Sequence, residues 1–193
     1  MPATEDPLAL FASERTKAFE AKDPMAALCS VATVDDQGIP SVRTLVLRDL
    51  DGKLALFVNA TSPKWPGLQK QFSVMTYWPS VQIQYRMQVT GKPVPHEVVA
   101  ESWLLRPDAP KRMDWFYEQV QGQSTAIGDR ETLLKKLEGV ELPDPLGAPG
   151  NAKGVELVVG VVERLDLNQG DGVHERRGWS AVAEDWVSRA FVP

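Results

Sequence analysis

The chain has few of the residues that build thiol or histidine metal sites, and it has no long apolar run. Its 193 residues include one cysteine, Cys29, and two histidines, His96 and His174. A lone cysteine excludes an intramolecular disulfide and a zinc site made of several thiolates, and it fits a reducing compartment. No stretch approaches the ~18 consecutive apolar residues of a membrane-spanning helix, and no signal-like segment opens the chain. We therefore expect a cytoplasmic protein without a metal site or membrane contact.

Positive charge is also scarce. The 21 Lys and Arg residues are outnumbered by 26 Asp and Glu residues, so the formal net charge is −5. Proteins that bind nucleic acids or anionic membranes need clustered positive charge, and this balance argues against both classes. Any bound anion must therefore be held by a few locally placed cations. The length and the ordinary globular composition fit a single domain over residues 1–193.

Hydrophobic periodicity predicts one helix followed by a sheet. Between Asp6 and Lys22, residues recur at intervals of three and four, which is typical of an amphipathic helix. The mostly apolar stripe of this helix consists of Leu8, Phe11, Arg15 and Phe19. Segments rich in Val, Leu, Thr and aromatic residues predict strands at Ala26–Val34, Ser41–Leu50, Lys53–Ala60, Ser73–Trp78, Val81–Thr90, Val155–Leu167, His174–Ser180 and Trp186–Phe191. Asp51-Gly52 between two of these segments predicts a hairpin, and such turns with short connections favour an antiparallel meander or barrel.

Further helices are expected within and after the early strands. Ser62-Pro63 is typical of an N-cap followed by proline at the first helical position, so a short helix begins there. The middle of the chain predicts helices at Glu97–Arg106, Lys111–Gln119 and Asp129–Glu138, before a Pro- and Gly-rich loop over residues 143–150. His96 is expected at a helix start. We thus predict a mainly β domain with an N-terminal helix and a helical insertion around residues 96–140.

Two arginines, Arg43 and Arg48, bracket an otherwise apolar strand. They can simply lie along the strand surface, or they can bind a ligand. Their separation of five residues places them on opposite faces unless a bulge intervenes, so they should contact different parts of any ligand. After the next strand, backbone N–H groups, the Ser62 hydroxyl and the Lys64 ammonium can together hold a phosphate.

Two more polar clusters follow the period of a strand. The first has four side chains on one face, Gln82, Gln84, Arg86 and Gln88. A solvent-facing polar surface explains them equally well, although amides and guanidinium groups also suit the pyrimidine edge of a flavin. The second cluster has His174 and Arg176 on one face.

These motifs occur in an order that resembles the pyridoxamine 5'-phosphate oxidase family. They are Val42–Arg48, Phe57–Lys64, Gln123-Ser124 and His174–Arg176, and the similarity covers most of residues 24–193. The resemblance implies a split β-barrel that binds FMN in a cleft between the two subunits of a homodimer. It also implies an oxidase that transfers a hydride from its substrate to FMN and then reduces dioxygen to hydrogen peroxide.

Site residues are carried over from the resemblance by position. The implied FMN-binding residues are Arg43, Thr44, Leu45, Val46, Arg48, Phe57, Val58, Ser62, Lys64, Gln84, Arg86, Gln123, Ser124 and Arg176. Gln84 and Arg86 are alternatives for one flavin-facing position. The implied substrate-binding residues are Arg48, Arg106 and His174, and His174 is the candidate catalytic residue.

The chain departs from the family on the substrate side. Gly172 stands where the family has an arginine, and Asn168 where it has a flavin-stacking tryptophan. In the cluster that binds the substrate phosphate, Arg48 and Arg106 remain basic, whereas Ser102 and Pro110 replace a tyrosine and a serine. An FMN-binding protein or an NAD(P)H-dependent flavin reductase without vitamin B6 activity is therefore the alternative function. A purely structural dimerisation module is the weaker third possibility.

Overall fold

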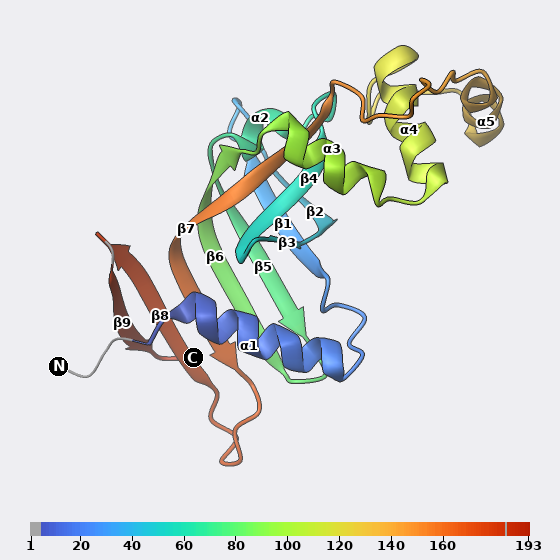
Figure 1. The fold of residues 1–193 in the computed structure, drawn as a ribbon. Coiled ribbons are helices and arrows are strands. Elements are labelled where there is room, and N and C mark those ends of the chain that lie inside the picture. The colour runs from blue at the N-terminus through green and yellow to red at the C-terminus, as the bar shows by residue number, and fades with distance from the viewer. Residues whose placement is uncertain (1–4, 184) are drawn as a thin grey trace.

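A single antiparallel sheet dominates the computed structural model, which describes residues 5–183 and 185–193 (Figure 1). Its strands are β1 (Leu28–Val34), β2 (Pro40–Val46), β3 (Arg48–Leu50), β4 (Lys53–Asn59), β5 (Gln71–Trp78), β6 (Ile83–Pro93), β7 (Ala152–Asp166), β8 (Glu175–Val182) and β9 (Asp185–Phe191). They are ordered β2-β1-β5-β6-β7-β4-β3, and β8 joins β7 to β9. The predicted mainly β architecture is confirmed, and most predicted strands differ from the observed ones only at their ends.

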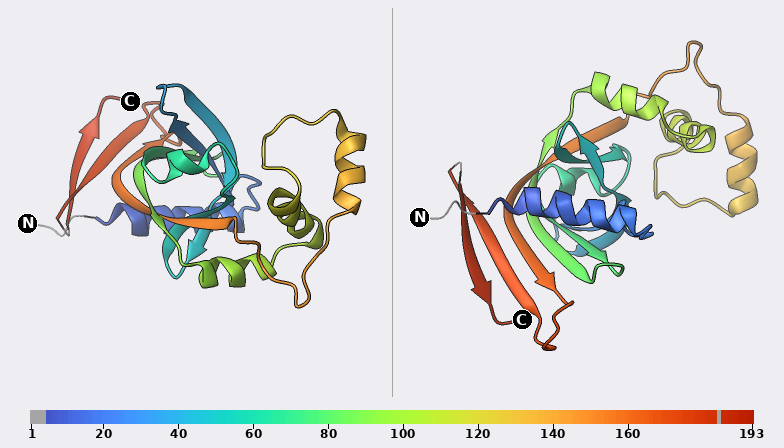
Figure 2. Two further views of the ribbon diagram at one scale, coloured as in Figure 1. Left: turned by 90° about the horizontal axis from the view of Figure 1, so that it is seen from above. Right: turned by 60° about the horizontal axis from the view of Figure 1, so that its bottom comes forward.

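The predicted strand Ser41–Leu50 is in fact two strands that lie at opposite edges of the sheet. Before Leu47 the chain pairs with β1, and after Leu47 it pairs with β4. The Leu47 side chain is buried, and its N–H donates to Ala27 O at 2.9 Å. Because one continuous segment connects the two edges, the sheet must curl into a barrel. Figure 2 shows this curled sheet from two further directions.

The long strands β6 and β7 form the spine of the molecule. Alternate residues of β6 are buried, in accordance with the period of two. A bulge between Gln88 and Val89 shifts the β6–β7 register, and bulges of this kind bend a strand. The first part of β7 pairs with β4, and the last part pairs with β8. The β8–β9 hairpin therefore extends away from the barrel (Figure 1).

Helix α1 (Pro7–Glu20) covers one end of the barrel. Phe11 packs against Trp78 and Tyr85, with ring centroids 5.2 and 5.0 Å away. The predicted helix is confirmed, but Phe19 is half exposed, and Glu14 and Ala18 share the buried face instead. The shift follows from Arg15, which donates to Ala26 O at 2.9 Å and to Leu47 O at 2.6 Å and so fixes the rotation of the helix.

A buried ion-pair network ties α1 to the spine. The Glu14 carboxylate accepts a hydrogen bond from the Tyr85 hydroxyl, and both carboxylate oxygens face Arg164, with an Nη2 to Oε1 distance of 2.7 Å. Arg164 also contacts Asp166 at 2.9 Å and Glu175 at 3.3 Å. Burial lowers the pKa of Arg164, but hydrogen bonds and attraction to Glu14 outweigh it, so the pKa is raised. This network joins α1, β6, β7 and β8.

The remaining helices are α2 (Trp65–Leu68), α3 (His96–Leu104), α4 (Asp108–Gln119) and α5 (Arg130–Glu138). The predicted N-cap at Ser62 is wrong, because α2 begins only at Trp65, and Pro66 lies in its first turn. The predicted position of His96 at a helix start is confirmed, and so is the predicted helix Asp129–Glu138, in which Asp129 is the N-cap. Figure 2 shows α4 and α5 projecting to one side of the barrel. None of the helices in the described part of the chain combines the length and apolarity needed to cross a membrane.

Cys29 is expected to be inert toward alkylation in the folded protein. It is buried in β1, and burial raises the pKa of its thiol to about 12. Because the thiolate is the reactive species, iodoacetamide at about pH 8 should modify native protein far more slowly than protein unfolded in urea. Mass spectrometry of timed samples measures both rates. Native and unfolded rates within about tenfold of each other would contradict this prediction.

Candidate functional site

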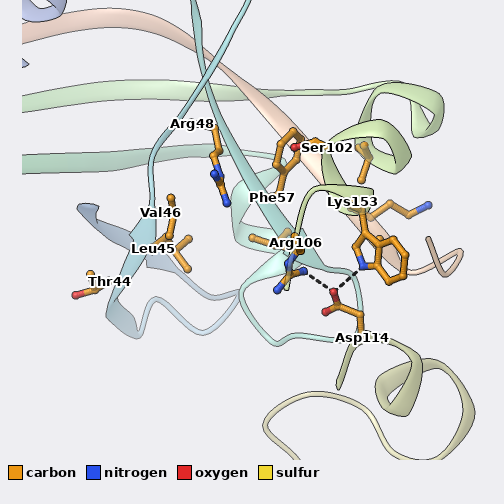
Figure 3. Close-up of a pocket in the computed structure, with 13 residues that line it drawn as sticks. Thr44, Leu45, Val46, Arg48, Phe57, Ser102, Arg106, Asp114 and Lys153 are labelled. Atoms are coloured by element: carbon orange, nitrogen blue, oxygen red, sulfur yellow. Dashed lines mark hydrogen bonds and ion pairs between the residues drawn. The ribbon is translucent and has the colours of Figure 1, made fainter. Parts of the chain in front are cut away.

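A cavity of about 260 Å³ opens between β2, β4 and the helices α3 and α4 (Figure 3). Small-molecule sites typically measure about 300–1,000 Å³, so this space suits a small compound or part of a larger ligand. Seven of the predicted site residues line it: Thr44, Leu45, Val46, Arg48, Phe57, Val58 and Arg106. The structure therefore brings together residues from three separate parts of the chain.

The break at Leu47 determines which side chains face this cavity. Arg48 starts β3 and reaches the cavity beside Thr44 and Val46 of β2. Arg43 instead lines a separate depression next to α2. The expectation that Arg43 and Arg48 contact different parts of a ligand is thus consistent with their positions. The strand change at Leu47, rather than simple alternation along one strand, produces this separation.

A group of cations and amides surrounds the connection between β4 and α2. Lys64 Nζ donates to Ser62 Oγ at 2.7 Å and to Gln123 Oε1 at 3.4 Å, and the Gln123 N–H donates to Thr61 Oγ1 at 2.9 Å. Burial, together with the charge of Arg43, lowers the pKa of Lys64. In the described ranges, neither Lys64 nor Arg43 forms an ion pair with a carboxylate. We name Arg43, Ser62, Lys64 and Gln123 the cation cluster.

A second polar cluster lies on β6, β7 and β8. Glu163 accepts hydrogen bonds from Arg86 Nη2 at 2.5 Å and from Arg176 Nη2 at 2.6 Å. Burial acts to raise the pKa of Glu163, but these hydrogen bonds outweigh it and the pKa is lowered. Gln84 and Arg86 line the same small depression of about 130 Å³. We name Gln84, Arg86, Glu163 and Arg176 the hairpin cluster.

Two sequence-based placements change in the structure. His174 lies in the turn before β8, where it is exposed, so strand alternation does not place it beside Arg176. Gln82 lies in the turn before β6 with φ 55°, so it does not continue the row of Gln84, Arg86 and Gln88. Ser124 is exposed, and its φ is 67°.

The two clusters do not meet within one chain. The cation cluster lies near α2, whereas the hairpin cluster lies where β8 pairs with β7, at a different part of the barrel (Figure 1). Arg43 of the cation cluster and the residues of the hairpin cluster line separate depressions, and neither the hairpin cluster nor His174 lines the cavity of about 260 Å³. A single chain thus gathers predicted residues into three separate groups, which are the cavity between β2, β4, α3 and α4, the cation cluster and the hairpin cluster. No group of metal-binding side chains is present in the described residues.

Known proteins resemble this chain over nearly its whole length, although no protein-family model matches it. The pyridoxine/pyridoxamine 5'-phosphate oxidase of Pseudomonas fluorescens is 28% identical over 204 residues, covering 99% of this chain and 90% of that protein. The enzyme of the same name from Haemophilus influenzae is 25% identical over 195 residues, covering 98% and 90%. The sequence resemblance is therefore confirmed.

Two solved structures share the fold. PhzG from Burkholderia lata 383, in complex with tetrahydrophenazine-1-carboxylic acid, has a TM-score of 0.82 at 21% identity, covering 100% of this chain and 95% of that one. A pyridoxamine 5'-phosphate oxidase-related, FMN binding protein from Nostoc punctiforme has a TM-score of 0.78 at 20% identity, covering 98% and 100%. The chain has the pyridoxamine 5'-phosphate oxidase fold. The predicted split β-barrel is thereby confirmed.

Within this pyridoxamine 5'-phosphate oxidase fold, the sequence reasoning missed two acidic residues. Glu163 had a local signal, since it is an acidic residue within an apolar strand and lies opposite Arg86. Asp114 had none, because it comes from α4 and reaches Trp103 and Arg106 only after the chain turns at Pro107. Both residues neutralise arginines at predicted site positions. The net charge that each of these sites offers to a ligand thus depends on a carboxylate that strand or helix periodicity alone cannot identify.

Proposed function

We propose that the protein is an FMN-dependent oxidoreductase that binds FMN without covalent attachment. The cation cluster carries this proposal. A phosphate monoester needs several cationic or N–H donors, and in an acidic chain these must be placed locally. Arg43 and Lys64 lie close enough for the charge of one to affect the pKa of the other, beside the hydroxyl of Ser62 and the amide of Gln123. This donor set fits the phosphate of FMN.

The proposed working unit is a symmetric homodimer with FMN between the subunits. A partner subunit can supply its hairpin cluster to the cation cluster of the first, which would join the two groups that one chain keeps apart. Exposed apolar side chains on β2, β8 and β9 support an interface of this kind, because association would bury them: Val42, Val46, Val182, Val187 and Phe191. Within the hairpin cluster we assign the flavin-facing position to Gln84, since Glu163 already pairs with Arg86.

FMN, when bound, can accept a hydride from the substrate and pass the electrons to dioxygen, which yields hydrogen peroxide. The chain's own residues would orient the substrate carbon and exclude water. Arg48 and Arg106 line the cavity between β2, β4, α3 and α4 directly, whereas His174 would have to reach it from the partner subunit. Gly172, near His174, has φ +76°, so an arginine at this position would need a strained backbone. We assign His174 to substrate positioning and propose a cytoplasmic location.

The second candidate is a flavin reductase or flavin carrier without vitamin B6 activity. The pairing of Arg106 with Asp114 favours it, because this arginine is no longer free to bind a substrate phosphate. Ser102 lines the cavity where the family has a tyrosine, whereas Pro110 does not line it. Mixing the anaerobic holoprotein separately with pyridoxamine 5'-phosphate and with NADPH separates the candidates. Flavin bleached only by pyridoxamine 5'-phosphate indicates an oxidase, and flavin bleached only by NADPH indicates a reductase. Flavin bleached by neither compound favours a flavin carrier or another electron donor.

Protein purified with excess FMN is expected to stay yellow through gel filtration and to elute at the mass of a dimer. The cation cluster predicts retention, and the exposed apolar strands predict the dimer. Absorbance of the protein peak gives the flavin content, and light scattering gives the mass. Colourless protein would contradict the cofactor proposal, whereas a yellow monomer would contradict only the shared site.

A further inference from the structure

Asp114 neutralises Arg106 at the wall of the cavity of about 260 Å³ between β2, β4, α3 and α4. Its Oδ2 atom accepts hydrogen bonds from Arg106 Nη1 and from the Trp103 indole, the latter at 2.8 Å. Two donors on one oxygen are what an ionised carboxylate accepts, and arginine stays protonated in proteins. Burial raises the pKa of Asp114, while the charge of Arg106 and the Trp103 hydrogen bond oppose that effect. The arginine and the aspartate together therefore present no net charge to a ligand.

The other cations of the cavity differ in orientation. In the described ranges Arg48 has no ion-pair partner, and it projects among the labelled cavity residues in Figure 3. Lys153 extends away from them in this view, whereas Arg106 turns toward Asp114. Arg48 is thus the cation without an ion-pair partner that points among the labelled residues in this view, whereas Lys153, which also lines the cavity, extends away from them. Phe57, Val99 and Trp103 supply an apolar lining around it.

We propose that Asp114 is a specificity-determining residue that restricts this cavity to an aromatic substrate carrying a single negative charge, a carboxylate, and disfavours phosphate esters. This inference rests on the proposed function, since it takes the cavity as the substrate site. A phosphate dianion bound in this cavity would meet only Arg48 as an inward-directed cation, and it would lie near the Asp114 carboxylate. A carboxylate needs only one guanidinium, because arginine binds it through two parallel hydrogen bonds.

The test compares phenylacetate with phenyl phosphate, two aromatic probes that differ mainly in their anionic group. Calorimetry with and without added FMN gives their affinities, so a failure of FMN binding is seen separately and does not hide the result. The wild type should bind phenylacetate at least about tenfold more tightly than phenyl phosphate, a ratio that one charge-assisted hydrogen bond supports. Equal affinities, or no binding of phenylacetate, would overturn the proposed substrate class.

The decisive variant is Asp114→Asn, which keeps an oxygen for Trp103 and releases Arg106. It should bind phenyl phosphate at least about tenfold more tightly than the wild type. The double variant Asp114→Asn/Arg106→Gln should lose that gain, and Asp108→Asn, at an exposed position on the same helix, should match the wild type. If folded Asp114→Asn binds phenyl phosphate no better than Asp108→Asn does, Asp114 does not determine specificity.

Arg48→Gln provides an independent test should Asp114→Asn fail to fold. This change removes the one inward-directed cation while leaving the pair of Arg106 and Asp114 intact. Phenylacetate affinity should fall at least about tenfold. An unchanged affinity would mean that the carboxylate is bound by Arg106 or Lys153, and the charge assignment of the cavity would be wrong.

Discussion

Replacing Glu14 by alanine is expected to lower the free energy of unfolding by about 3–5 kcal/mol, the range for removing one partner of a buried ion pair. Glu14 and Arg164 are both nearly inaccessible, at 5% and 9% exposure. Without the carboxylate, Arg164 would keep only Asp166 and the more exposed Glu175. The buried Tyr85 hydroxyl would also lose its acceptor. The effect should therefore exceed that of losing a simple surface contact.

Glu20→Ala is the matched control, because Glu20 lies on the exposed side of the same helix. It should change stability by no more than about 0.5 kcal/mol. Urea unfolding followed by circular dichroism measures both variants. A double-mutant cycle with Arg164→Met should also show a double variant less destabilised than the sum of the two single variants. If Glu14→Ala lies within about 1 kcal/mol of Glu20→Ala, the network does not hold α1 to the barrel.

Local sequence signals were sufficient for the elements that local geometry determines. Asp51-Gly52 predicted a hairpin, and both residues adopt positive φ in the turn between β3 and β4. The predicted helix Asp129–Glu138 is a second case, since Asp129 caps it and its side chain accepts from the Thr132 N–H. In these cases the residues that carry the signal lie within a few positions of the feature they determine.

Features that depend on contacts distant in sequence could not be derived in this way. The strand break at Leu47 exists because the barrel closes there, and nothing within Ser41–Leu50 marks it. Glu14 meets Arg164 across 150 positions, so an acidic residue on a helix gave no sign of being buried. Individual site residues were easier to nominate than their partners, since the family motifs are local. The carboxylates that pair with the site arginines come from other elements of the chain.

The largest change in FMN affinity is expected for the double variant Arg43→Ala/Lys64→Ala. Each residue can make a charge-assisted hydrogen bond to a phosphate, with a contribution of about 1.5–3 kcal/mol. Removing both should raise the Kd for FMN at least about a hundredfold. Arg176→Ala should weaken binding less, since Arg176 is already paired with Glu163. Flavin fluorescence quenching measures each affinity, and thermal melting verifies that the variants fold.

Two control variants exclude a general effect of lost positive charge. Lys53 forms an exposed ion pair with Glu156. Arg177, which follows Arg176 in the sequence, forms an ion pair with Glu5. Lys53→Ala and Arg177→Ala should bind FMN like the wild type, because neither residue belongs to the cation cluster or to the hairpin cluster. A loss of affinity in these controls as large as that of Arg43→Ala/Lys64→Ala would show that net charge, rather than local placement, binds the cofactor.

Mixed dimers test whether the FMN site is shared between subunits. One subunit carries Arg43→Ala/Lys64→Ala, the other carries Arg176→Ala, and two different affinity tags isolate the mixed species. If the FMN sites are shared, one of the two sites in the mixed dimer contains both altered clusters. The other site contains the unaltered cation cluster of one subunit and the unaltered hairpin cluster of its partner. The mixed dimer should therefore bind one FMN with wild-type affinity, although each parent homodimer binds FMN more weakly than the wild type does.

A site built within each chain would give the opposite result. Each subunit of the mixed dimer would then carry one altered cluster, and neither position would reach wild-type affinity. The separation of the cation cluster from the hairpin cluster within one chain favours the shared arrangement. Titration of the mixed dimer distinguishes the two, because recovery of half the high-affinity sites can arise only if the clusters of different subunits form one site. Failure to recover a doubly tagged species would instead contradict the homodimer itself.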